Sequence, residues 1–99
     1  MKLRKMDVVI NRKRYQTETS VLLAHDAYWD GQNFERNGRN TFLLRTVRGN
    51  YFVQYQTLWQ GERDTIQPIS REEAIEMYEG LPEKEVPFEE AFGFSPEEA

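Results

Sequence analysis

Two apolar runs within residues 41–57 predict a β-hairpin, and we expect the rest of the chain to pack around it. Residues 41–47 and 51–57 are rich in β-branched and aromatic side chains, which are typical of strands. Between the runs, Arg48-Gly49-Asn50 offers a two-residue turn at either Gly49-Asn50 or Arg48-Gly49. A lone hairpin is only marginally stable in water, so other segments are expected to cover one of its faces.

Both turns predict the same division of side chains between the two faces, because even-numbered residues of one run then oppose odd-numbered residues of the other. The mostly apolar face, expected to pack on the core, carries Phe42, Leu44, Thr46, Tyr51, Val53 and Tyr55. The mixed face, expected to be partly exposed, carries Leu43, Arg45, Val47, Phe52, Gln54 and Gln56.

Helical spacing of apolar residues occurs on both sides of the hairpin. Thr17 is a suitable N-cap for a helix over residues 18–28, which has apolar residues along one side. Near the C-terminus, Pro87 precedes a stretch that predicts a short helix over residues 88–92.

A further helix and two short strands complete the predicted elements. Ser70 and Glu73 have the spacing of a capping box, which predicts a helix over residues 71–79. Residues 7–10 form a short apolar run and predict a first strand, which pairs back on the segment that follows it. Residues 65–68 predict another strand, and the proline at its end indicates an edge position.

The order of these elements predicts an α+β fold. It consists of a small antiparallel sheet of three or four strands centred on hairpin 41–57, with helices at about 18–28 and 71–79 and a short C-terminal helix at 88–92. We expect one domain over residues 1–93 and a frayed tail over residues 94–99.

The composition is that of a folded domain without cysteine chemistry. The chain has 99 residues, of which 30% are charged and 13% are aromatic, and it has no cysteine. Disulfides and cysteine-based metal sites are therefore excluded, and a reducing, cytoplasmic location is expected. No apolar run approaches the roughly 20 residues that cross a bilayer, so we expect no membrane association.

Charge is distributed unevenly along the chain. Residues 1–50 hold ten Lys or Arg against five Asp or Glu, whereas residues 51–99 hold three against twelve. The acidic half is interpreted as solvated faces of glutamate-rich helices, and a surface for a partner is the alternative.

Four spaced motifs cover most of the chain. The segment Val9 to Thr19 resembles an I-N-G-K-x-Y-x-T-E-T opening, and Leu43 to Phe52 is similar to L-Y-x-T-x-x-G-x-Y-F. Ile66 to Glu76 matches I-x-P-L-S-x-E-E-A-x-E, and Phe92-Gly93 reproduces a final F-G. As a set, these motifs resemble a group of short uncharacterised bacterial and phage proteins for which no function is established.

The resemblance implies a small phage or mobile-element effector that binds a host or rival macromolecule, in the manner of anti-CRISPR proteins and phage-encoded polymerase inhibitors. It transfers no catalytic residue. The chain departs from the group at Arg12, where the group often has glycine, and at residues 58–62, which replace a glycine-rich stretch.

Candidate catalytic and metal-binding residues are few. His25 is the only histidine, and its place in the predicted helix favours a packing or surface role over that of a general base. Adjacent residues on a helix point about 100° apart, so the three Glu-Glu pairs do not converge on a metal ion. We therefore predict no enzyme activity, catalytic residue, metal or cofactor.

Two binding functions follow from the residues. The first hypothesis is a non-enzymatic module that binds another protein, with the candidate contacts Trp29, Arg45, Gln54, Gln56 and Trp59. The alternative is a nucleic-acid-binding module using the basic half, in which aromatic residues accompany the cations. Those cations are Arg12, Lys13, Arg14, Arg36, Arg39, Arg45 and Arg48, and the aromatic residues are Tyr28, Trp29, Tyr51 and Phe52. Nothing in the sequence sets an oligomeric state.

Overall fold

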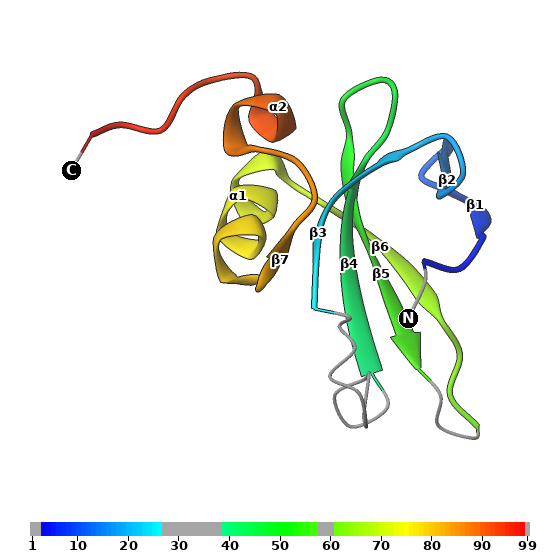
Figure 1. Ribbon diagram of the computed structural model, residues 1–99. Coiled ribbons are helices and arrows are strands. Elements are labelled where there is room, and N and C mark those ends of the chain that lie inside the picture. The colour runs from blue at the N-terminus through cyan, green and yellow to red at the C-terminus, as the bar shows by residue number, and fades with distance from the viewer. Residues whose placement is uncertain (1–2, 27–38, 58–60, 99) are drawn as a thin grey trace.

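The protein is mostly β-sheet. Its computed structural model describes residues 3–26, 39–57 and 61–98. The strands in these ranges are β1 (Asp7–Ile10), β2 (Lys13–Gln16), β3 (Val21–His25), β4 (Arg39–Arg45), β5 (Tyr51–Thr57), β6 (Thr65–Ile69) and β7 (Glu83–Lys84). Two helices are present in the same ranges, α1 (Arg71–Gly80) and α2 (Phe88–Phe92) (Figure 1). Neither helix is long and apolar enough to cross a membrane.

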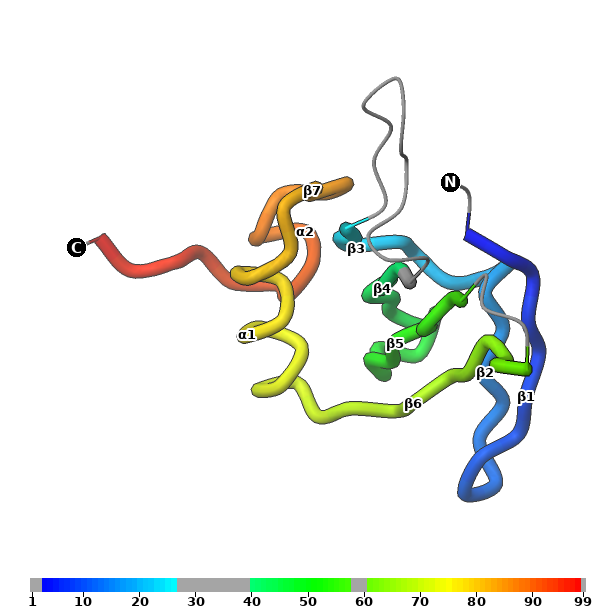
Figure 2. Tube along the Cα trace, turned by 90° about the horizontal axis from the view of Figure 1, so that it is seen from below, coloured from blue at the N-terminus to red at the C-terminus, as the bar shows by residue number. Residues whose placement is uncertain are grey.

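The strands form two antiparallel sheets. The larger sheet has the order β6-β5-β4-β3-β7, and β1 and β2 form a separate hairpin. Figure 2 shows the two helices and β7 on one side of β3, β4 and β5, with the β1–β2 hairpin on the other side. Both faces of the central strands are therefore covered by other parts of the chain.

Each face of the sheet has its own apolar core. On the helix side, the core contains Leu43, Val53, Tyr51, Ala74, Tyr78, Ala91 and Phe92 among its buried residues. On the hairpin side, it consists of Tyr15, Phe42, Leu44 and Phe52, with Val8 and Ile10 packed against them. Because both faces of β4 and β5 are buried, these strands contain near-continuous apolar runs.

The predicted α+β class is wrong, because the sheet is larger than expected and the helix predicted over residues 18–28 is absent from the described part of that range. Val21–His25 forms β3, which pairs with β4 on one side and β7 on the other. Leu23 and Ala24 are fully buried there. A short apolar run fits a strand buried on both faces as well as a helix, and the neighbouring strands decide between the two.

The register of the central hairpin also differs from the prediction. Thr46 N–H donates to the Asn50 carbonyl over 2.8 Å, so the turn has three residues, 47–49, instead of two. Leu44 therefore pairs with Phe52, and even-numbered residues oppose even-numbered ones. Phe42 and Leu44 consequently lie on the opposite face from Val53 and Tyr51, because the side-chain period of a strand is two.

Local signals at the helix ends and at the edge of the sheet are confirmed. Ser70 and Glu73 form the capping box of α1. Pro68 lies in β6, an edge strand of the larger sheet. Gly93 ends α2 with a φ of 81°, a conformation that favours glycine.

Candidate functional site

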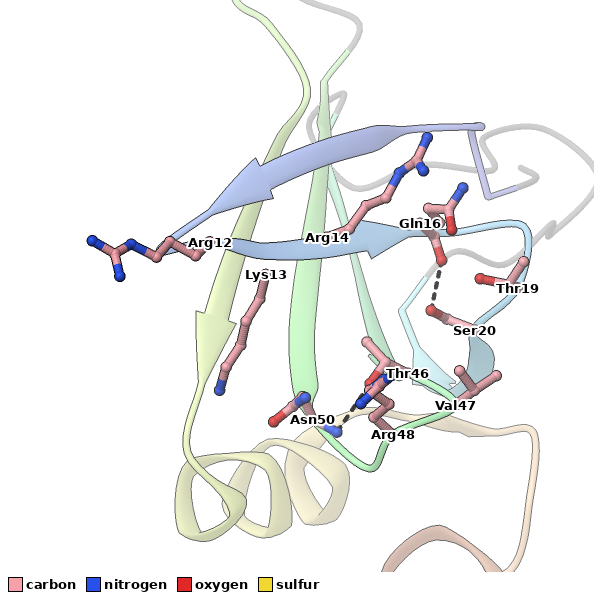
Figure 3. A pocket seen from close by; sticks show the side chains of 10 residues that line it. All are labelled: Arg12, Lys13, Arg14, Gln16, Thr19, Ser20, Thr46, Val47, Arg48 and Asn50. Carbon is pink, nitrogen blue, oxygen red and sulfur yellow. Dashed lines mark hydrogen bonds between the residues drawn. The ribbon is translucent and has the colours of Figure 1, made fainter.

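A cleft of about 420 Å³ lies between the turns of the two hairpins, and it is rich in cations (Figure 3). Four segments provide its described lining: the β1–β2 turn, strand β2, the connection from β2 to β3, and the β4–β5 turn with its flanking residues. The lining residues are Arg12, Lys13, Arg14, Gln16, Thr19, Ser20, Thr46, Val47, Arg48 and Asn50. None of these residues is acidic, so the cleft carries positive charge.

Strand register explains why Lys13 faces the cleft. In the β1–β2 hairpin, Lys13 pairs with Ile10 and Tyr15 pairs with Val8, so these four residues share one face. Tyr15 and Val8 pack on the larger sheet, whereas Lys13 lies at the turn end of the same face, where it is exposed. Figure 3 shows its side chain pointing from β2 toward the β4–β5 turn.

Arg14 projects to the other face of the hairpin and is neutralised there. Its guanidinium donates two hydrogen bonds to the Asp7 carboxylate, over 2.9 and 2.7 Å. These hydrogen bonds lower the pKa of Asp7 and raise that of Arg14. Arg14 therefore binds Asp7 of β1, and its charge is less available to a ligand in the cleft.

Arg12 occupies a backbone conformation that is unusual for its residue type. Asn11 and Arg12 have φ values of 52° and 66°, and they form the two-residue turn between β1 and β2. Positive φ at both positions is the pattern of a type I′ turn, for which Asn-Gly is the preferred pair. An arginine therefore stands where a glycine would be less strained, and its side chain projects from the tip (Figure 3).

The β4–β5 turn brings Val47 and Arg48 to the opposite wall. Gly49 has a φ of 87° and donates to the Thr46 carbonyl over 3.0 Å, which stabilises the turn. The Thr46 hydroxyl also accepts a hydrogen bond from the Asn50 backbone N–H. Val47 is 81% exposed, and Arg48 beside it is exposed as well.

The side chains of three lining cations have no partner in the part of the chain that the structure describes. No hydrogen bond or ion pair joins the side chain of Arg12, Lys13 or Arg48 to another residue there. Around them, Thr19, Thr46 and Asn50 add hydroxyl and amide groups, whereas the Ser20 hydroxyl donates to the Gln16 carbonyl over 2.6 Å. Unpaired cations beside neutral hydrogen-bond donors are suited to an anion with several oxygen atoms, such as a phosphate.

The residues predicted for protein contact are arranged differently. Gln54 and Gln56 are almost completely buried. Gln54 Nε2 donates to the Arg4 carbonyl over 2.8 Å, and Gln56 Nε2 donates to Gln54 Oε1 over 2.7 Å. Arg45 Nη1 donates to the carbonyls of Glu90 and Ala91 at the end of α2. Trp29 and Trp59 lie outside the described residues.

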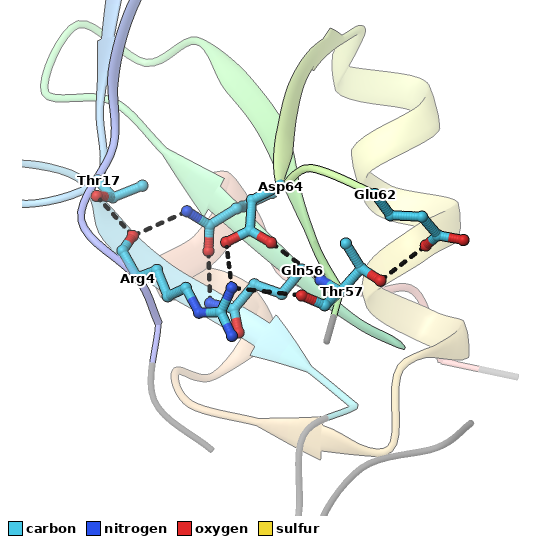
Figure 4. Close-up of polar contacts among 7 residues, drawn as sticks. Arg4, Thr17, Gln56, Thr57, Glu62 and Asp64 are labelled. Carbon is cyan, nitrogen blue, oxygen red and sulfur yellow. Dashed lines mark hydrogen bonds and ion pairs between the residues drawn. The ribbon is translucent and has the colours of Figure 1, made fainter. Parts of the chain in front are cut away.

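The two glutamines belong to a polar network that attaches the N-terminal segment to the sheet (Figure 4). The Arg4 guanidinium forms an ion pair with Asp64 over 2.8 Å. Asp64 also accepts a hydrogen bond from the Thr57 backbone N–H. Thr17, predicted to cap a helix, instead donates to the Arg4 carbonyl and accepts from Met6 N–H. The network therefore serves the fold, because each of these residues forms an internal hydrogen bond or ion pair.

His25 lies at the other end of β3 from the cleft. Its Nε2 is 2.7 Å from a carboxylate oxygen of Glu85, and its ring lies 5.5 Å from that of Phe42. No group of three or more His, Cys, Asp or Glu suited to a metal occurs within the described ranges.

A second cavity, of about 300 Å³, lies at the end of the sheet away from the hairpin turns. Asn40, Tyr55, Gln56 and Arg63 contribute to its lining. Asn40 is 2% exposed, and neither its Nδ2 nor its Oδ1 has a hydrogen-bond partner among the described residues. A buried amide without partners destabilises the folded state.

Sequence reasoning found the cations of the cleft but missed its other members. Arg12, Lys13 and Arg48 are among the predicted basic residues, whereas Ser20 and Thr46 were not considered as site residues. The alternation of side chains along β2 could have indicated where Lys13 lies, because Lys13 and Tyr15 are two residues apart and therefore share a face. The meeting of the two turns has no sequence signal, because it depends on how the hairpin packs on the sheet.

Comparison of the chain with protein-family models, curated proteins and solved structures returned no match.

Proposed function

We propose that this protein is a non-enzymatic binding module whose cleft takes the phosphate backbone of a nucleic acid. The observation that supports this proposal most directly is a group of three cations, Arg12, Lys13 and Arg48, whose side chains have no partner among the described residues. They line a cleft whose described lining contains no carboxylate. Phosphate contacts by Lys and Arg supply most of the affinity of sequence-independent nucleic-acid binding. The effector role implied by the resemblance extends this proposal: such a module would act by occupying nucleic acid.

The protein-binding hypothesis has less support among the described residues. Gln54 and Gln56 are buried, and Arg45 is engaged by α2. We therefore place the nucleic-acid function first.

The test is binding of a labelled oligonucleotide at low salt, measured by fluorescence anisotropy, followed by a salt titration. The double variant Lys13→Glu/Arg48→Glu is compared with wild type and with Arg63→Glu. Arg63 is also exposed, but it lies at the second cavity. Circular dichroism confirms that each variant is folded.

We expect wild type and Arg63→Glu to bind, and the double variant to lose most of its affinity. Each lost phosphate contact should reduce the slope of log K against log salt concentration by about 0.9 for duplex DNA. Absence of binding by wild type at low salt would refute the proposal. The double variant changes the net charge by four units and Arg63→Glu by two. A loss of binding free energy in Arg63→Glu that is half of the loss in the double variant would also refute the proposal, because the effect would then follow net charge alone.

A further inference from the structure

We infer that the preferred ligand of the cleft is a nucleic-acid duplex, with the β4–β5 turn directed into its minor groove. This inference rests on the proposed function and specifies the form of nucleic acid and how it is bound.

The first argument is that the cleft has no aromatic platform among its described lining residues. Proteins that bind single strands without sequence preference stack bases on aromatic side chains. Here Phe52 contacts Tyr15 inside the core at a centroid distance of 5.4 Å, and Tyr51 packs on Phe92 at the same distance. The aromatic residues of β5 predicted to accompany the cations are therefore unavailable for stacking. A cleft of cations and hydroxyls is suited to phosphates, which a duplex presents on its outside.

The second argument concerns the tip of the β4–β5 turn. Val47 is 81% exposed and is followed directly by Arg48, in a turn braced by the hydrogen bonds between Thr46 and Asn50. Proteins that bind the minor groove use arginine, which responds to the negative potential of the groove, and frequently insert apolar side chains between base steps. A narrow, braced turn with this pair at its tip has the chemistry required for that position.

The third argument is the separation of charge between the two sides of the sheet. Residues 70–98, which contain both helices and β7, hold ten acidic residues and two basic ones. Residues 3–20, which contain the β1–β2 hairpin, hold five basic and two acidic residues. The two groups lie on opposite sides of β3, β4 and β5 (Figure 2). A polyanion is therefore repelled from the helices and attracted to the hairpin side, which orients a protein of net charge −4 on its ligand.

The fourth argument is the position of Arg12. It has a φ of 66° in a turn that favours glycine, so the residue carries a conformational cost. Strained residues are concentrated at functional sites, where the side chain has a use. The function that we assign to Arg12 is a contact between its guanidinium and a phosphate on the far side of the groove.

The experiment compares oligonucleotides of equal length at one salt concentration: an A·T-rich duplex, a G·C-rich duplex and their separate strands. Inorganic polyphosphate is added as a competitor to represent phosphate without bases or a groove. The variants are Lys13→Ala, Arg48→Ala and Val47→Ser, with Arg63→Ala as the control.

We expect duplexes to bind about tenfold more tightly than single strands, and the A·T-rich duplex to bind more tightly than the G·C-rich one, as minor-groove contacts require. Arg48→Ala and Val47→Ser should reduce the preference for A·T, whereas Lys13→Ala should weaken both duplexes equally. Arg63→Ala should change neither quantity.

Equal or tighter binding of single strands would overturn the inference, and so would an A·T preference that is unaffected by Arg48→Ala. Displacement of every oligonucleotide by polyphosphate at matched phosphate concentration would also overturn it, because phosphate charge alone would then account for binding. These results would leave the phosphate-binding function intact, whereas failure of all oligonucleotides to bind at low salt would refute both proposals.

Discussion

The ring of Tyr15 meets the ring of Phe52 nearly edge-on, with centroids 5.4 Å apart and an interplanar angle of 67°. Tyr15 belongs to β2 and Phe52 to β5, so this contact joins the separate hairpin to the larger sheet. The position of Lys13 over the cleft depends on the contact, because Lys13 is on the same face of the same strand.

Removing one ring of this pair should detach the hairpin. Phe52 is fully buried, and Phe52→Ala is expected to lower the free energy of unfolding by about 3–5 kcal/mol. A double-mutant cycle with Tyr15→Leu and Phe52→Leu should give a coupling energy of about 0.5–1.5 kcal/mol, measured by urea denaturation. A coupling energy near zero would contradict the role assigned to the contact.

Arg12→Gly should stabilise the protein and weaken its binding. Glycine relieves the positive φ of 66° and creates an Asn-Gly type I′ turn, so we expect a gain of about 1 kcal/mol in the free energy of unfolding. The same change removes a cation from the cleft, so affinity for nucleic acid should fall. Arg12→Lys keeps the charge and the strain, and it should leave both properties nearly unchanged. A stability loss in Arg12→Gly would show that the turn conformation is not strained.

Replacement of the buried Asn40 amide by an apolar side chain should also stabilise the fold. Neither polar atom of its side chain has a hydrogen-bond partner in the described part of the chain, and leucine has the same branched shape as asparagine. We expect a gain of about 1 kcal/mol or more, read from the urea midpoint. The matched variant is Gln54→Leu, which deletes a donor to the Arg4 carbonyl and should be destabilising. If both variants lose stability, Asn40 has a polar role in the folded protein.

Arg45 is expected to act on stability through α2. Its guanidinium donates to the Glu90 and Ala91 carbonyls over 2.6 and 2.8 Å. Arg45→Ala should therefore cost about 1–2 kcal/mol in the free energy of unfolding, since hydrogen bonds to charged groups contribute more than neutral ones. Arg48→Ala is the matched control, because Arg48 has no such contacts and its loss should barely change the urea midpoint. An unchanged midpoint in Arg45→Ala would return this residue to the candidates for partner contact.

Acid should destabilise the protein through two carboxylates with lowered pKa values. Hydrogen bonds from Arg14 lower the pKa of Asp7 from its ordinary 3.8, and the backbone N–H and hydroxyl of Ser70 lower that of Glu73 from 4.5. Because both pKa values are lower in the folded state, their stabilising effect is complete above these ordinary values. It is lost as the pH falls below them and through the folded-state pKa values.

Urea denaturation at a series of acidic pH values measures this dependence. We expect Asp7→Asn and Glu73→Gln each to flatten the fall in midpoint below pH 4.5, the ordinary pKa of Glu73. Glu97→Gln, in the exposed C-terminal segment, should follow the wild-type curve. Identical curves for all variants would mean that these two hydrogen-bonded carboxylates do not contribute to the acid sensitivity.

Local chemistry determined several elements of this protein without help from the rest of the fold. The capping box at Ser70 and Glu73, the edge strand containing Pro68, and the short helix over residues 88–92 are all in place as predicted. Each depends on a hydrogen bond or a backbone preference within a few residues, so the order of residues is sufficient. The basic character of the cleft was likewise visible in the cations of the N-terminal half.

Tertiary structure decided the features that depend on neighbours distant in sequence. Val21–His25 is a strand because β4 and β7 pair with its two edges, although its apolar pattern also suits a helix. One extra residue in the 47–49 turn exchanges the faces of one hairpin strand relative to the other. Gln54 lies inside the protein because the N-terminal segment covers its face of the sheet. The cleft exists only because Tyr15 packs on Phe52 and brings the two turns together. Strand pairing and packing between segments distant in sequence stabilise these features. A local sequence pattern does not show which distant segments will be in contact.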